Sequence, residues 1–194
     1  PVEYKISKKK KAILEADEGI TPRTKEGLAA LKAFIPGGVH SSGVQTHPAD
    51  GNAGFIVTTR GKAQELSADK NVEIQIISYG FTRVEKGFMA AAPVPAAESA
   101  LKNAGLALKD IKAIKTHNPF AANDAFMSKK MGLDPMTFNN YGSSMIFGHP
   151  QGPTAGRCIA ELIEELVILG GGYGLFTGCA AGDTGAALVV KVTG

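Results

Sequence analysis

Residues 153–169 constrain the fold of this chain more than any other segment. Their large apolar side chains lie on one side of a helix, and Pro153 suits the first helical turn. Apolar strands follow at residues 174–177 and 186–192, so the helix has a sheet to pack on. The apolar stripe consists of Ile159, Leu162, Ile163, Leu166 and Leu169.

Strands and helices also alternate in the chain before this helix. Apolar runs predict strands at residues 72–79 and 111–116. Helical patterns cover residues 96–103 and 121–131, and each pattern is ended by a glycine. The predicted class is therefore α/β.

The N-terminal third is more polar, and its elements are shorter. Leu28, Leu31 and Phe34 recur at three-residue spacing, which indicates a helix over residues 24–34. Glycine, serine, histidine and threonine are frequent in residues 38–54 and predict a loop. We further expect a strand at residues 1–11, a short helix at 49–53, a buried strand at 54–59 and a helix at 61–66.

Composition excludes several classes of function. The formal net charge of +3 comes largely from Lys8–Lys11, a run too short to indicate nucleic-acid binding. Two cysteines and four histidines show no spacing typical of a disulfide framework or a metal site. No apolar run reaches the roughly 18 residues of a membrane span, and no signal-peptide core is visible. We therefore expect a reducing, cytoplasmic setting.

A histidine precedes the long helix in a loop rich in glycine. His149 stands between Gly148 and Pro150, in a stretch that begins at Asn140. Glycine lets the backbone approach a ligand closely, and the helix N-terminus supplies unpaired N–H groups. Such a place suits an imidazole that faces a thioester. Taken by itself, the pattern is more typical of an ordinary turn at a helix start.

A cysteine marks the turn between the last two strands. Cys179 is flanked by small residues, so a substrate can reach it, and nearby backbone N–H groups favour its thiolate. A lone cysteine is more often a core residue. Cys158 lies within the long helix and is interpreted as structural.

Together these two loops resemble the thiolase family, and the resemblance extends over nearly the whole chain. It implies a thiolase-like layered fold with a mixed five-stranded sheet and helices on both faces. The matching motifs are Gly148-His149-Pro150 followed by residues 154–157, Cys179-Ala180-Ala181, residues 89–96 with Pro93-Val94-Pro95-Ala96, the loop 38–51 before residues 54–59, and Asp17, Glu18 and Arg23.

Three motifs depart from the common family pattern. The usual Asn-Glu-Ala-Phe is replaced by His117-Asn118-Pro119-Phe120, which resembles the variant of sterol carrier protein-type and archaeal thiolases. Ala181 replaces the glycine of the cysteine motif. The usual Asn-Ala-Ser-Gly of the coenzyme A loop is replaced by residues 44–47. These changes bear on substrate choice more than on reaction class.

The resemblance implies roles for nine residues. His149 would activate a nucleophilic cysteine, Cys179 would act as general acid and base, and His117 would help to hold an enolate oxygen. Coenzyme A thioesters would be the substrates, and no cofactor is implied. Ala181, Phe120 and Met89 would form the oxyanion and substrate pocket, and Ser42, Gly43 and Thr46 would bind coenzyme A.

The nucleophilic cysteine of thiolases belongs to the N-terminal half of the family, which has no counterpart in this sequence. Residues 1–66 would be the end of the loop region and the last strand and helix of that first domain, and residues 67–194 the C-terminal domain. A partner chain, as a separate subunit or as the other product of a cleaved chain, would carry the nucleophile. Dimers or tetramers of such pairs, a hetero-oligomer, would follow.

Two alternatives remain open. A decarboxylating ketoacyl synthase-type condensing enzyme shares the fold, but Cys179 argues against it because those enzymes use histidine or asparagine there. A non-catalytic thiolase-like subunit would account for His117, Ala181 and residues 44–47. Retention of both His149 and Cys179 favours an acyl-CoA C-acyltransferase.

Overall fold

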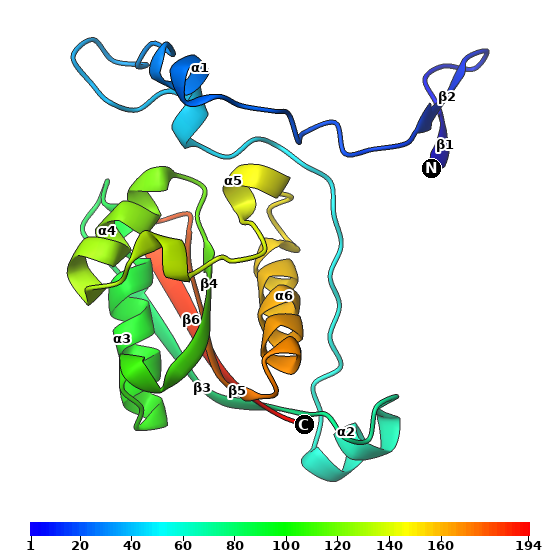
Figure 1. Ribbon diagram of the computed structural model, residues 1–194, viewed down its shortest axis with the longest axis vertical. Coiled ribbons are helices and arrows are strands. Elements are labelled where there is room, and N and C mark those ends of the chain that lie inside the picture. The colour runs from blue at the N-terminus through cyan, green and yellow to red at the C-terminus, as the bar shows by residue number, and fades with distance from the viewer.

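A four-stranded sheet forms the centre of the larger part of the molecule (Figure 1). The structure is a computed structural model that describes residues 1–194. In spatial order the strands are β3 (Glu73–Arg83), β6 (Thr184–Thr193), β5 (Gly172–Ala180) and β4 (Ile111–His117). β6 is antiparallel to both neighbours, whereas β4 and β5 are parallel. The α/β class and the mixed sheet are confirmed, but the sheet has four strands and not five.

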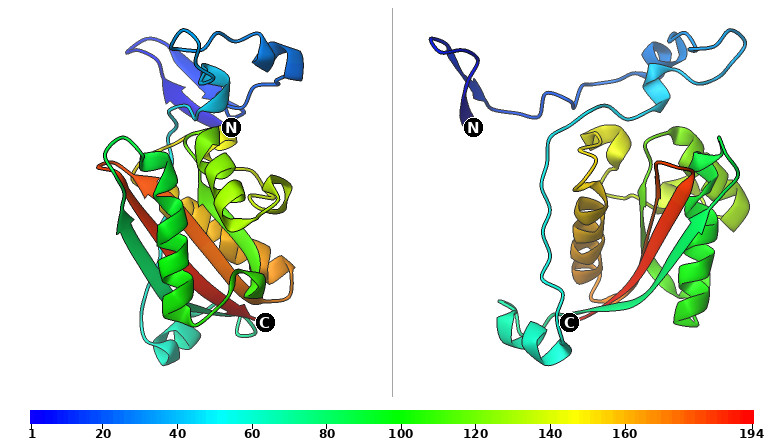
Figure 2. Two further views of the ribbon diagram at one scale, coloured as in Figure 1. Left: turned by 90° about the vertical axis from the view of Figure 1, so that its left-hand side faces the viewer. Right: turned by 180° about the vertical axis from the view of Figure 1, so that it is seen from behind.

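Helices cover both faces of this sheet (Figure 2). α3 (Pro93–Ala104) lies on one face with α4 (Ala121–Met131) beside it, and α6 (Thr154–Ile168) lies on the other face. Proline at the start of α3 suits the first turn, and Gly105 ends the helix in the left-handed conformation. The predicted stripe of α6 is buried at Leu162 and Leu166.

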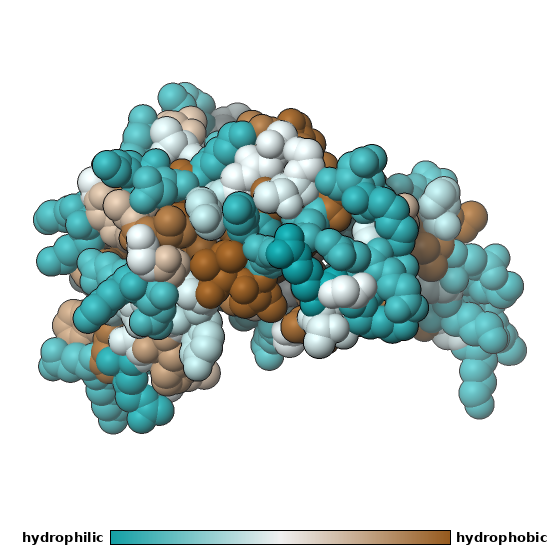
Figure 3. Space-filling view, turned by 90° about the horizontal axis from the view of Figure 1, so that it is seen from below, coloured by the Kyte–Doolittle hydropathy of each residue, from teal (hydrophilic) through white to brown (hydrophobic).

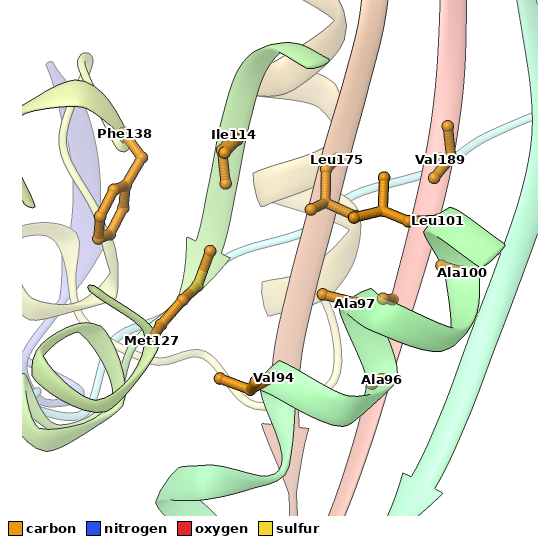
Figure 4. Packing of buried hydrophobic residues seen from close by; sticks show 11 residues of the cluster. Val94, Ala96, Ala97, Ala100, Leu101, Ile114, Met127, Phe138, Leu175 and Val189 are labelled. Atoms are coloured by element: carbon orange, nitrogen blue, oxygen red, sulfur yellow. The ribbon is translucent and has the colours of Figure 1, made fainter. Parts of the chain in front are cut away.

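The larger core lies between α3 and the sheet (Figure 4). Alanines along α3 let its backbone approach the strands, where Leu175 and Val189 are fully buried. Gly80 of β3 is required at the closest approach, because an added Cβ would lie 2.2 Å from the Ala96 carbonyl oxygen. Each fully buried aliphatic side chain contributes about 1.5–3 kcal/mol to the free energy of unfolding. The cluster comprises Val94, Ala96, Ala97, Ala100, Leu101, Ile114, Met127, Phe138, Leu175, Ala187 and Val189.

Short helices complete the connections around the sheet. Of these, α5 (Ser144–Phe147) matters most for the site, because it ends at Gly148 just before His149. Ser143 caps α5 by accepting from the Met145 N–H. The others are η2 (Met89–Ala91), η3 (Leu108–Asp110) and η4 (Pro135–Thr137). No helix has both the length and the apolar character needed to cross a membrane.

The N-terminal segment extends away from this three-layer unit (Figure 1). β1 (Val2–Lys5) and β2 (Lys11–Leu14) form a hairpin where a single strand was predicted. The predicted helix over 24–34 is limited to α1 (Lys25–Ala29), because Pro36-Gly37-Gly38 turns the chain and the Phe34 N–H bonds to the His40 carbonyl. The short helix predicted at 49–53 is absent, and η1 (Ser42–Val44) lies earlier in the loop.

The predicted strand at residues 54–59 is also absent. The segment is extended and runs along α6 toward α2 (Arg60–Leu66), but it pairs with no other strand (Figure 2). Ile56 is 80% exposed, and Phe55 and Val57 are exposed as well. An apolar strand needs a neighbouring strand for its backbone groups, and this chain offers none at that place.

Candidate active site

Two of the predicted catalytic residues, His117 and Cys179, lie where two parallel strands end. β4 ends at His117, and Gly178 pairs with it in register one residue before Cys179 on β5. Because parallel strands carry their carboxyl ends at the same edge, both side chains reach the same end of the sheet. Gly178 is needed there, since an added Cβ would lie 2.9 Å from the His117 Cβ.

His117 is buried and has one defined polar partner. Its Nδ1 lies 2.8 Å from the Ser144 hydroxyl at the start of α5. Burial, aided by neighbouring His149 and by the Arg157 guanidinium, lowers the pKa of His117 to about 4. The imidazole is therefore neutral at pH 7, and a neutral ring carries its single proton on one nitrogen only.

His149 is held from both sides. Its backbone N–H donates to the His47 carbonyl at 2.8 Å, and Gly148 before it has a φ of +81°, which glycine adopts readily. Its Nδ1 lies 2.8 Å from the hydroxyl of Thr154 in the first turn of α6. Burial lowers the pKa of His149. The two imidazoles stack, with ring centroids 4.4 Å apart.

Cys179 is buried against α4. The amide Nδ2 of Asn123 lies 3.5 Å from its Sγ and also donates to the Ala90 carbonyl at 3.1 Å. The Asn123 oxygen accepts from the Phe120 N–H, so the amide is fixed at both ends. Burial raises the pKa of the Cys179 thiol, and the hydrogen bond from Asn123 opposes this rise. The resting thiol is protonated at neutral pH.

A small apolar pocket lies beside His117 and Cys179. It has a volume of about 130 Å³ and is lined by His117 and Cys179. The aromatic rings of Phe81 on β3 and Phe176 on β5 line the pocket, together with Ala155 of α6. An imidazole and a thiol at the rim of an apolar pocket can bind an oxyanion and move a proton.

The loop between β4 and α4 is supported by a polar network. Thr116 donates from its hydroxyl to Asp124 at 2.9 Å, and the Asn118 amide donates to the same carboxylate. Asn139 receives the Thr116 N–H on its oxygen and donates to the Thr116 hydroxyl. These bonds fix the backbone on both sides of His117. Burial raises the pKa of Asp124.

A buried ion-pair cluster lies between β4 and α6. The fully buried Lys115 ammonium is 2.7 Å from Glu161, although the angles fall short of an ideal hydrogen bond, and Arg157 binds the other Glu161 oxygen at 2.7 Å. Arg157 also lies over the Phe147 ring, 5.3 Å from its centroid. The cluster thereby links α6 to β4 just before His117.

The predicted pocket residues are not all in one place. Ala181 lies exposed in the turn after β5, and Met89 is half-buried at the start of η2. Phe120 precedes α4, and its ring packs edge-on against His40 at 5.4 Å. Phe120 is joined to the site by a hydrogen bond from its N–H to Asn123.

The residues predicted to bind coenzyme A lie in the loop around η1. Ser42 is exposed, and Gly43 packs against Leu28 and Leu31. The Thr46 hydroxyl donates to the Ser144 carbonyl at 2.5 Å, and its N–H donates to the Pro119 carbonyl. Thr46 therefore connects this loop by hydrogen bonds to α5, which precedes His149, and to the segment that follows His117. No group of three or more histidine, cysteine or acidic side chains is arranged to hold a metal ion.

Three residues of the site were missed from the sequence. Asn123, Ser144 and Thr154 contact Cys179, His117 and His149 respectively. Asn123 lies six residues after His117, in a stretch that reads as an ordinary helix start. Thr154 belongs to the segment 154–157 that resembles the family motif, but its contact with His149 depends on the fold of the loop between them.

Comparison with known proteins identifies what this arrangement is similar to. Residues 70–192 match the family described as thiolase, C-terminal domain. The mouse mitochondrial 3-ketoacyl-CoA thiolase is 31% identical over 195 residues, covering 100% of this chain and 48% of its own length. The rat peroxisomal 3-ketoacyl-CoA thiolase B is 33% identical over 189 residues, covering 96% and 44%.

Solved structures of similar proteins share the fold of this chain. The acetyl-CoA acetyltransferase of Bacillus anthracis superposes with a TM-score of 0.85 at 29% identity, covering 99% of this chain and 48% of that one. The human mitochondrial 3-ketoacyl-CoA thiolase gives 0.83 at 27% identity, with 100% and 48% covered. The chain thus spans about half the length of the relatives it matches.

Proposed function

The chain belongs to the thiolase family, and from this premise we propose that it is the acid/base-bearing part of an acyl-CoA C-acyltransferase. The reaction would be thiolytic cleavage or Claisen condensation of a β-ketoacyl-CoA. One observation carries the proposal: His117 at the end of β4 stacks on His149, and β5 brings the protonated Cys179 to the same end of the sheet. Coenzyme A thioesters would be the substrates.

Cys179 would move the proton in both half-reactions. Cleavage of a β-ketoacyl-CoA leaves electron density on the α-carbon of the departing acetyl-CoA, which needs a proton. The protonated Cys179 thiol supports this role because it can donate that proton from Sγ. The resulting thiolate would then take the proton from an incoming coenzyme A thiol.

The two imidazoles would stabilise the enolate oxygen and activate the nucleophile. Neutral His117 can donate from its ring to an oxyanion, because its proton is held at pH 7 without a positive charge. A donor of this kind contributes on the order of 3 kcal/mol to transition-state stabilisation. The Thr154 hydroxyl can accept from the His149 Nδ1, which would leave Nε2 as the base toward the nucleophilic cysteine.

The nucleophile would come from an N-terminal thiolase half. Residues 1–66 would then complete that half, and residues 67–194 would form the C-terminal domain. That half would be a separate subunit or the other product of a cleaved chain. Pairs of this kind would assemble into dimers or tetramers.

Two uncovered apolar surfaces support a partner domain. On β3, Ser78 and Gly80 face α3, so Tyr79 and Phe81 face the opposite side of the sheet, where α6 covers β4 and β5. Tyr79 is 73% and Phe81 is 67% exposed. The second surface is the unpaired segment 54–57. Figure 3 shows a hydrophobic patch near the middle of one face, surrounded by more hydrophilic residues.

The contacts with the coenzyme A thioester and the cellular compartment are proposed as well. Ser42, Gly43 and Thr46 would lie near the coenzyme A, with Ala181, Phe120 and Met89 around the acyl part. The engaged hydroxyl of Thr46 favours an indirect role, through the loop that it fixes. A cytoplasmic setting is proposed from the two free cysteines, whereas the names of several relatives state mitochondria or peroxisomes.

A non-catalytic thiolase-like subunit is the second candidate. The exposed position of Ala181, which replaces the family glycine, favours it. A thiolysis assay separates the two candidates. The native assembly is tested with acetoacetyl-CoA and with longer and aromatic β-ketoacyl-CoAs, with and without Cys179→Ala. If this chain takes part in catalysis, Cys179→Ala lowers kcat by about 10²–10⁴-fold. Unchanged turnover in this variant would favour the non-catalytic role.

A further inference from the structure

The hydroxyl of Ser144 lies at a junction of two buried groups. Ser144 is fully buried, and its Oγ is 2.8 Å from the His117 Nδ1. A hydrogen bond from the Ser144 side chain also lowers the pKa of the Cys158 thiol on α6, against the larger effect of burial. Two contacts anchor its backbone: the Thr46 hydroxyl bonds to its carbonyl, and the Gly148 N–H donates to the same oxygen. These contacts hold the Ser144 backbone in place beside His117.

The hydrogen atoms of this junction can be assigned from the partners. The Cys158 sulfur lies 3.9 Å from the Thr116 carbonyl oxygen, which accepts the S–H. A thiol sulfur is a weak acceptor, whereas the unprotonated nitrogen of a neutral imidazole is a strong one. The Ser144 O–H therefore donates to the His117 Nδ1 in preference to Cys158. The proton of the His117 ring must then lie on Nε2.

We propose that Ser144 is a positioning residue that holds His117 as the Nε2–H tautomer, with that N–H available to the acyl oxygen of a thioester substrate. This inference rests on the proposed thiolase function for its catalytic meaning. The buried hydrogen bond fixes the ring orientation as well as the tautomer, because only one ring nitrogen can face Ser144. Without the hydroxyl, the proton distributes over both nitrogens, and part of the population has an acceptor where the oxyanion needs a donor.

The neighbouring Ser143 provides a matched control. It has the same side chain and the same buried setting, but its hydroxyl caps α5 by accepting from the Met145 N–H. Ser143→Ala removes a hydroxyl from the same short helix without touching His117. Any change caused only by loosening α5 would appear in both variants.

The experiment uses the native assembly in which this chain alone carries ¹⁵N-histidine. Magic-angle-spinning NMR at pH 7 reads the protonation of each ring nitrogen, and His117→Asn identifies the His117 signals. The wild type is expected to show one tautomer, protonated at Nε2, and Ser144→Ala a mixture. Thiolysis kcat with acetoacetyl-CoA is expected to fall on the order of 10-fold in Ser144→Ala with little change in KM. Ser143→Ala should keep the single tautomer.

Two spectra would overturn the inference. A wild-type His117 protonated at Nδ1 would show that the hydroxyl accepts from the ring. A wild-type Nε2–H tautomer that persists in Ser144→Ala would show that another group fixes the ring. Neither spectrum depends on turnover. Absence of thiolysis in the wild type would contradict the proposed function, while the tautomers would still decide the role of Ser144.

Discussion

The imidazole rings of His117 and His149 stack with their centroids 4.4 Å apart and their planes inclined by 36°. They come from different elements, the end of β4 and the loop before α6, and each Nδ1 faces a hydroxyl on the helix beside it. Two adjacent cationic rings would repel each other, so the pair favours neutral imidazoles.

The depressed pKa of His117 makes folding stability depend on pH. Its folded pKa of about 4 lies below the ordinary value of 6.5, so the unfolded chain takes up the proton first as the pH falls. The contribution to the free energy of unfolding is complete above pH 6.5 and is lost between pH 6.5 and 4. Urea unfolding of wild type and His117→Asn should diverge over this range by on the order of 3 kcal/mol. Free energies of unfolding that differ between the two proteins by the same amount at every pH would contradict a buried, neutral His117 imidazole.

Asn123 should tune the reactivity of Cys179. Its amide is 3.5 Å from the sulfur, and this bond lowers the thiol pKa against the effect of burial. Asn123→Ala should therefore shift the pH profile of Cys179 alkylation by iodoacetamide to higher pH and lower thiolysis by about 10-fold or more. Asn103→Ala is the matched control, because that amide bonds to the Tyr79 carbonyl on the surface. A profile identical to wild type would exclude the contact.

Gly178 should be required for the position of His117. An added Cβ would lie 2.9 Å from the His117 Cβ, which leaves no room for the present ring position. Gly178→Ala should lower the free energy of unfolding by about 1–3 kcal/mol and reduce thiolysis. The control is Gly61→Ala on α2, where an added Cβ meets no atom within 4 Å. Equal behaviour of the two variants would show that the contact is easily relieved.

The exposed face of β3 should be needed for assembly. Tyr79 is 73% exposed on β3, on the side of the sheet where α6 covers only the neighbouring strands. Tyr79→Glu should weaken association with the N-terminal half, measured by size-exclusion chromatography with light scattering, because it places a charge in an apolar interface. Met136→Glu, at an 83% exposed residue on η4, should leave the assembly intact. Unchanged association of Tyr79→Glu would assign the surface to another role.

The regular elements of residues 73–193 could be predicted because local pattern and tertiary packing agree there. The stripe of α6 is an example, since Leu162 and Leu166 are the residues that the sheet buries. Residues 54–59 have an equally strong strand pattern but remain unpaired, because a strand needs neighbours that this chain does not contain. The sequence pattern indicates that a segment can form a strand, but the strand forms only where a neighbouring strand is present to pair with it.

The same distinction applies to the site. His117, His149 and Cys179 were selected from motifs, and the fold brings His117 and His149 into contact. The residues that hold them, Asn123 and Ser144, have no signature because their contacts cross between elements. Long-range contacts of small polar side chains cannot be read from local sequence.

The central claim is that this chain supplies proton transfer and the acyl group is carried elsewhere. The most direct test is the intact mass of every chain of the native assembly after brief incubation with acetyl-CoA and acid quenching. The account predicts an acetyl adduct on the N-terminal thiolase half, retained in Cys179→Ala, with Cys158 and Cys179 unmodified. An acetyl group on Cys179 or Cys158 of this chain would contradict it.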